Sequence, residues 1–137
     1  VGTDSTFVSS TLSNNDQVSV DVSSGTGCIS GSGNTNAQVS PLPTTFNVTG
    51  GGAYCTGGSG VEINVSGSTS GTIYRLLLNG QVTDSLTGTG NALTFANRTA
   101  AGAYTVVAVS AAGCTQNMNG TANISINALP VAEAGND

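Results

Sequence analysis

Several residue types that carry chemistry are missing from this chain of 137 residues. It contains no tryptophan, no histidine and no lysine, and its only two basic residues are Arg75 and Arg98. Nucleic acids and anionic membrane surfaces are bound by clusters of basic residues, which two separate arginines cannot form. No apolar run is long enough to span a membrane. The composition therefore predicts no nucleic-acid partner and no direct membrane insertion.

Acidic residues are also few, and they are scattered. Seven acids and two arginines give a formal net charge of −5 at pH 7. General acid–base catalysis needs groups held within reach of one another, and a hydrolytic triad needs a base such as histidine. The glycine-rich stretches at 50–52 and 57–60 lack the lysine and the helix of a phosphate-binding loop. We therefore expect no enzyme: no catalytic residue and no cofactor.

Metal ligands are equally sparse. Glu133 and Asp137 are weak candidates for calcium, because they follow a linker and tandem extracellular modules often bind calcium between domains. Calcium takes six to eight oxygen ligands, and two carboxylates do not supply them. The cysteines show no CxxC spacing and have no histidine beside them, which argues against zinc. We expect no metal site.

What the sequence does contain is a set of short alternating apolar runs. Hydrophobic residues make up 37% of the chain, and they fall in runs of a kind that disordered chains lack. In residues 100–114, Tyr104, Val106 and Ala108 point to one side of a strand, and Thr105, Val107 and Val109 point to the other. We predict an all-β fold in which seven short strands form a closed two-sheet sandwich with Tyr104, Val106, Ile63 and Leu76 in its core. The strand signals lie at 46–48, 61–66, 73–78, 81–86, 93–95, 104–109 and 120–127.

The chain also repeats itself. Residues 18–28 match residues 104–114 with the same spacing to a final cysteine, and Leu42-Pro43 recurs as Leu129-Pro130. A period of about 86 residues suits one small β-sandwich. The match predicts the C-terminal half of a repeat at 1–42, a complete repeat at 43–129 and the start of a third at 130–137. The chain is thus interpreted as a window of a tandem array, with Pro41-Leu42-Pro43 as an extended linker.

The first segment offers fewer strands. We expect a strand at 6–9, a turn at 14–16, a strand at 17–23, a loop at 25–34 and a closing strand at 37–40. Val18, Val20 and Val22 would form an apolar stripe facing the core. Such a half-sandwich has open strand edges, which recruit other strands. Either upstream residues or a neighbouring copy of the chain would have to complete it.

Three cysteines need an assignment. Cys55 and Cys114 stand at the two ends of the complete repeat, and Cys28 occupies the position that matches Cys114 one repeat earlier. A Cys55–Cys114 disulfide would close a loop of about 60 residues and contribute roughly 4 kcal/mol on the chain-entropy model. Free thiols are the alternative. A disulfide would indicate an oxidising, extracellular compartment.

One turn resembles a known structural motif. Residues 98–106, Arg-Thr-Ala-Ala-Gly-Ala-Tyr-Thr-Val, resemble the E–F corner of immunoglobulin-like domains, in which a tyrosine hydroxyl bonds back to the preceding turn. In antibody domains a cysteine follows two residues after that tyrosine, whereas here the position is Val106. The resemblance is therefore to the broad immunoglobulin-like group and not to antibody domains.

Three motifs together resemble one family. Residues 50–61 (GGGAYCTGGSGV), 74–80 (YRLLLNG) and 100–108 (AAGAYTVVA) are similar to the immunoglobulin-like repeats of very large secreted and cell-surface proteins of Bacteroidota, including gliding and adhesion proteins. The resemblance implies an immunoglobulin-like β-sandwich, export to the cell surface and service as spacer or adhesive modules.

Attached sugars are a further expectation. Asp4-Ser5-Thr6 and Asp84-Ser85-Leu86 resemble the O-glycosylation sequence of Bacteroidota, which makes Ser5 and Ser85 candidate sites. Five Asn-x-Ser/Thr sequons also occur, although a chain rich in these residues produces them by chance; they begin at Asn47, Asn64, Asn97, Asn119 and Asn123.

Two functions of different classes follow. The first is an extracellular structural or adhesive module of a bacterial adhesin or filament, whose partners are neighbouring copies or repeats of the same protein. The second is a carbohydrate-binding module of a secreted enzyme, with surface glycans as partners. Sugar platforms usually present exposed aromatic side chains. Only Tyr54 is expected to be available, because Tyr74 and Tyr104 are predicted to lie in the core.

Overall fold

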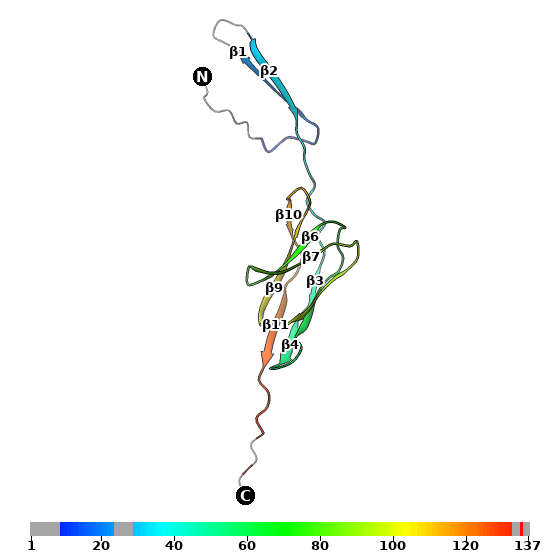
Figure 1. Ribbon diagram of the computed structural model, residues 1–137, viewed down its shortest axis with the longest axis vertical. Coiled ribbons are helices and arrows are strands. Elements are labelled where there is room, and N and C mark those ends of the chain that lie inside the picture. The colour runs from blue at the N-terminus through cyan, green and yellow to red at the C-terminus, as the bar shows by residue number, and fades with distance from the viewer. Residues whose placement is uncertain (1–8, 24–28, 133–134, 136–137) are drawn as a thin grey trace. The chain divides into compact units, whose positions relative to one another are not determined.

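The structure is a computed structural model that describes residues 9–23, 29–132 and 135, with the backbone alone at 21–23 and 29–32. These residues contain β-strands and no helix. They divide between Pro41 and Leu42 into two compact units. The division falls inside the predicted proline linker, one residue from the predicted boundary. Each unit is described by itself (Figure 1).

The strands form three sheets. β1 and β2 make a two-stranded sheet, β3, β5 and β8 make a three-stranded sheet in the order β3-β5-β8, and the rest make a six-stranded sheet in the order β4-β11-β9-β6-β7 with β10 beside β9. All pairs are antiparallel except β4 with β11, which is parallel. The strands are β1 Gln17–Ser23, β2 Ile29–Asn36, β3 Val48–Gly50, β4 Gly52–Cys55, β5 Val61–Val65, β6 Ile73–Leu78, β7 Gln81–Thr87, β8 Leu93–Arg98, β9 Gly102–Val109, β10 Thr115–Asn117 and β11 Ala122–Asn127.

The two larger sheets share one apolar core, an arrangement consistent with a β-sandwich. The four residues predicted to lie in this core are all buried, with exposed fractions of 0–2%. β9 alternates as expected, since the side chains that lie between its three buried residues are partly exposed. The three-stranded sheet contributes Val48, Ile63, Val65, Leu93 and Phe95, and the six-stranded sheet contributes Tyr74, Leu76, Tyr104, Val106, Ala108, Ala122 and Ile124.

Three consecutive glycines carry the chain from one sheet to the other. Gly50 ends β3 in the three-stranded sheet, and Gly52 begins β4 in the six-stranded sheet. Gly51 has φ +78°, and a Cβ at this position would lie 2.6 Å from the carbonyl oxygen of Asn123. Only glycine combines this backbone conformation with so close an approach. The sequence analysis found no strand signal between residues 48 and 61, so the strand after these glycines was not predicted.

The parallel pair decides where the chain enters and leaves the larger unit. Asn47 bridges Asn119 in parallel, and farther along Cys55 pairs with Asn127. Because β4 and β11 run side by side in the same direction (Figure 1), entry and exit lie at opposite ends of the unit. At about 3.3 Å per residue, the eight residues from Asn119 to Asn127 separate the two ends by on the order of 25 Å.

Two predictions about the strands of the larger unit were wrong. Nine strands are present in its described residues instead of seven, because β4 and β10 were not expected. The period-two spacing of Ala122, Ile124 and Ile126 predicts that all three face inward, but Ile126 is 44% exposed. It lies near the end of β11, opposite Tyr54 of the short edge strand β4.

The predicted Cys55–Cys114 disulfide is also wrong, since no disulfide joins these cysteines. The two cysteines lie at opposite ends of the six-stranded sheet. Cys114 follows the last residue of β9. Cys55 pairs with the last residue of β11, and the end of β11 extends past the first residue of β9. The path along the sheet from one to the other covers about ten residues, or on the order of 30 Å. A disulfide requires Cα atoms about 4.4–6.8 Å apart. Cys55 and Cys114 stand at the two ends of the repeat in sequence, but the fold does not bring them close together.

Within its described residues, the smaller unit contains one antiparallel strand pair, the β1–β2 hairpin. β1 spans the predicted strand 17–23, and a turn precedes it at Asn14 and Asn15. β2 extends through part of the predicted loop 25–34, and the predicted closing strand at 37–40 is irregular. A polar, glycine-containing sequence forms β2 because its backbone pairs with β1 over most of its length. The strand expected at 6–9 lies almost wholly outside the described residues, as does Cys28.

Candidate functional site

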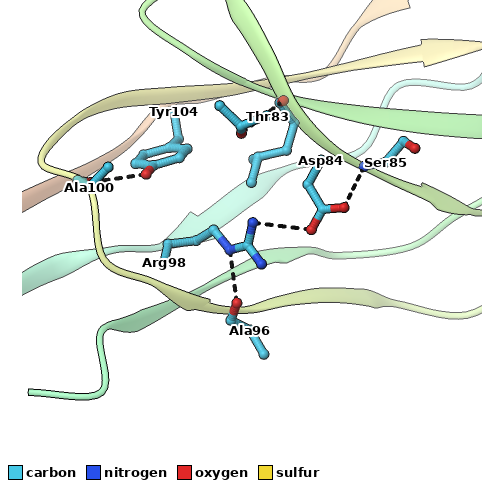
Figure 2. Close-up of polar contacts among 8 residues, drawn as sticks. Thr83, Asp84, Ser85, Ala96, Arg98, Ala100 and Tyr104 are labelled. Atoms are coloured by element: carbon cyan, nitrogen blue, oxygen red, sulfur yellow. Dashed lines mark hydrogen bonds and ion pairs between the residues drawn. The ribbon is translucent and has the colours of Figure 1, made fainter.

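The turn between β8 and β9 is held by a tyrosine. The Tyr104 side chain is 2% exposed, and its hydroxyl donates a 2.9 Å hydrogen bond to the carbonyl oxygen of Ala100 (Figure 2). The predicted bond from this tyrosine back to the preceding turn is therefore present. Burial raises the pKa of the Tyr104 hydroxyl, while Arg98 lowers it and Tyr54 raises it further. At neutral pH the hydroxyl is protonated and can serve as a donor.

A second tyrosine reaches the same turn from another strand. Tyr54 of β4 is half-buried, and its hydroxyl donates to the carbonyl oxygen of Thr99. The only aromatic side chain expected to be available to a sugar is thus partly covered by the core and already engaged by the turn.

Arg98 and Asp84 form an ion pair across the edge of the two sheets. Arg98 Nη1 of β8 lies 3.1 Å from Asp84 Oδ2 of β7, and Arg98 Nε donates to the carbonyl oxygen of Ala96 at 2.8 Å. Figure 2 shows the arginine reaching from its strand toward Asp84, with Tyr104 nearby. The side chains are 24% and 36% exposed, so water screens this pair and its contribution to stability is small.

A β-bulge aims Arg98 at its partner. Phe95 pairs with Ile63, and Arg98 pairs with Val61, so Ala96 and Asn97 together face one residue of β5. Asn97 has φ +55°, a left-handed conformation in which asparagine is enriched among non-glycine residues. The extra residue reverses the alternation of β8 and turns Arg98 to the side on which Phe95 lies. Asp84 lies opposite the buried Leu76 and so reaches this side from the other sheet.

A shallow pocket lies beside this pair. Its volume is about 240 Å³, which is below the range of about 300–1,000 Å³ usual for small-molecule sites. Its only charged lining group is Arg98, which Asp84 already neutralises. Hydroxyl, amide and guanidinium groups could bind a small polar molecule here, but they do not form a nucleophile with a base. The pocket is lined by Leu78, Thr83, Asn97, Arg98, Thr99, Ala100 and Tyr104.

Of the predicted modification sites, Asn97 lines the pocket and Ser5 lies outside the described residues. Ser85 is exposed on β7, an edge strand of its sheet, and its backbone N–H donates to Asp84 Oδ1 at 2.7 Å. Asn64 is half-buried and its amide oxygen accepts a 2.7 Å bond from the Thr94 hydroxyl. The other four sequon asparagines are exposed. Ser5, Glu133 and Asp137 fall outside the described residues.

Sequence reasoning missed the Arg98–Asp84 pair and the pocket. The two residues are 14 positions apart on strands of different sheets, and no sequence pattern announces the bulge that brings them together. Arg98 and Asp84 were each noted for other reasons, as the start of the tyrosine turn and as part of a glycosylation sequence. The one available indication was that charged residues are rare in this chain, so that an arginine and an aspartate in the same domain could pair.

No model of a known protein family matches the chain, and no curated protein matches it significantly. Within the described residues, no group of three or more His, Cys, Asp or Glu side chains could hold a metal ion, and no helix could cross a membrane.

Proposed function

We propose that residues 43–129 form an immunoglobulin-like domain that serves as a structural, non-catalytic module in a tandem array at a bacterial cell surface. Two features support the fold assignment. The Tyr104 hydroxyl bonds back to the turn before β9, and at Gly51 the chain passes from β3 in the three-stranded sheet to β4 in the six-stranded sheet. The resemblance of the sequence to repeats of Bacteroidota surface proteins is the basis for the cell-surface location and the adhesive role.

One observation carries the structural role: the parallel pairing of β4 with β11. Entry and exit at opposite ends allow copies to be joined one after another, each adding its own length to a chain of domains. Tension applied through the linkers also acts along β4 and β11. Their backbone hydrogen bonds lie across the direction of pull, so they must break together rather than one after another. A module that spaces or anchors an adhesin requires such resistance.

Single-molecule pulling on the full chain tests this proposal. Handles at Thr44 and Leu129 would load β4 and β11 in shear. Handles at Gly80 and Leu129 provide the matched control, because the β6–β7 turn lies at the same end as the exit of β11. We expect a higher unfolding force for the first pair of handles. An equal or lower force would contradict a load-bearing role.

The alternative, a carbohydrate-binding module, has less support. Tyr54 is half-buried with its hydroxyl engaged, and the pocket of about 240 Å³ is small and open. A glycan array probed with the full chain separates the two functions. Saturable binding that is lost in Asn97→Ala, a pocket residue with an exposed side chain, would favour the carbohydrate-binding module.

A further inference from the structure

The hairpin of the smaller unit and one hairpin of the larger unit share one residue pair at the offset of the sequence repeat, and the bulge after Val22 shifts the remaining pairs by one residue. Ser23 pairs with Ile29 at the end of β1, and Val109 pairs with Thr115 at the end of β9. Each residue of the second pair lies 86 positions after its counterpart in the first, which is the offset of the sequence repeat. The same shift places β1 within the bounds of β9. β1 and β2 are therefore the counterparts of β9 and β10.

The counterparts differ in what lies beside them. In the larger unit, β9 has β6 along its second edge, with Leu76 opposite Val106 and Leu78 opposite Tyr104. Within the described residues, β1 pairs with β2 and with no other strand. The other edge of β1 therefore has no strand beside it among these residues, and unpaired strand edges can pair with another strand.

The apolar faces of β1 and β9 also differ in how far they are covered. Val106 is 0% exposed, because the sheet of β5 and β8 covers it, whereas its counterpart Val20 is 55% exposed. Tyr104 is buried, whereas its counterpart Val18 is half-buried. An apolar strand face is stable when another sheet covers it. The larger unit shows which elements cover the matching face.

We infer that the β1–β2 hairpin is a docking surface for the front part of a repeat, a segment with the strand pattern of residues 44–86. This inference rests on the repeat interpretation in the proposed function. The segment's β6-like strand pairs antiparallel with β1 and places its counterparts of Leu76 and Leu78 opposite Val20 and Val18. Its β5-like strand covers the face on which these valines lie.

Charge supports this register. In the larger unit Arg75 of β6 pairs with Val107 of β9. The position that matches Val107 in the hairpin is Asp21. A β6-like strand in this register therefore brings an arginine directly opposite an aspartate. Opposite charges at directly opposed positions stabilise an antiparallel pair.

The test is an extended chain. Residue 1 corresponds to residue 87 of the complete repeat, so a second copy of residues 44–86 is fused directly before Val1 of the full chain. Hydrogen exchange, measured by mass spectrometry on peptides covering 17–23, is compared with the unfused chain. We expect exchange to slow by about 100-fold or more as the open edge becomes part of a cooperative unit.

Two variants of the fusion sharpen the test. Val20→Asp should abolish the added protection, while Ser19→Asp, on the opposite face of β1, should leave it in place; both should leave peptides from β9 unaffected. Unchanged exchange of residues 17–23 in the fusion would overturn the inference, as would equal loss in both variants. Protection of 17–23 in the unfused chain that increases with protein concentration would also overturn it, since a second copy would then be the occupant. None of these outcomes depends on the pulling experiment, which concerns the larger unit alone.

Discussion

The hydroxyl of Tyr104 donates a hydrogen bond to the carbonyl oxygen of Ala100, four residues earlier in the chain. This bond fixes the turn that leads from the three-stranded sheet into the central strand of the six-stranded sheet. Tyr104→Phe removes the bond and keeps the ring. We expect a loss of about 1 kcal/mol in the free energy of unfolding, measured by urea titration. An unchanged midpoint would show that the bond does not stabilise the turn.

The same residue gives a pH dependence. Burial raises the pKa of Tyr104 above its unfolded value of 10.0, so the folded state favours the neutral hydroxyl. The stabilisation from this group is complete below pH 10 and is lost as the pH rises through the folded pKa. The advantage of the wild type over Tyr104→Phe should therefore be constant from pH 7 to 9 and shrink above pH 10. An advantage that grows above pH 10 would reverse the sign of the assigned shift.

Gly51 provides a test of the crossing between sheets. Gly51→Ala forces a left-handed conformation on alanine and places its Cβ against the backbone of Asn123. Gly57→Ala is the matched control, because Gly57 also has positive φ but has nothing within 4 Å of its Cβ position. We expect the control to lose about 1–2 kcal/mol from conformation alone and Gly51→Ala to lose clearly more. Equal losses, compared by thermal melts, would mean that the β4–β11 pair shifts to accommodate a methyl group.

The Arg98–Asp84 pair should contribute little stability. Both side chains are partly exposed, and such pairs typically contribute about 0.2–1 kcal/mol. A double-mutant cycle with Arg98→Met and Asp84→Asn should give a coupling energy in that range, and the coupling should decrease in 1 M NaCl. A larger coupling that does not respond to salt would indicate that the pair is shielded from water in solution.

The cysteines can be checked chemically. Cys55 is exposed, so we expect it to react with a maleimide in the native protein. Peptide mapping without reduction should find no Cys55–Cys114 link. Cys55→Ser should change the free energy of unfolding by less than about 0.5 kcal/mol, as for other surface substitutions. A loss near 4 kcal/mol would be the signature of a disulfide with a loop of this length.

The sequence by itself determined the strands that have a strong period-two pattern. β6 follows from the apolar run that ends at Asn79-Gly80, and the buried face of β9 follows from the alternation of Tyr104, Val106 and Ala108. These patterns are local, because burial of one strand face depends on side chains two residues apart. β2 was not determined in this way, because residues 25–34 were predicted as a loop, and only the Ser23–Ile29 pair repeats a pair of the larger unit at the 86-residue offset.

Only the tertiary structure decided which strands pair with one another and which side chains meet between them. β4 is short and contains two residues of low strand propensity; it exists because β11 offers a parallel edge. Arg98 meets Asp84 because a bulge of one residue reverses its direction, and Cys55 misses Cys114 because the sheet holds them at opposite ends. Each outcome depends on pairing between segments distant in sequence, and a local pattern carries no information about its partner.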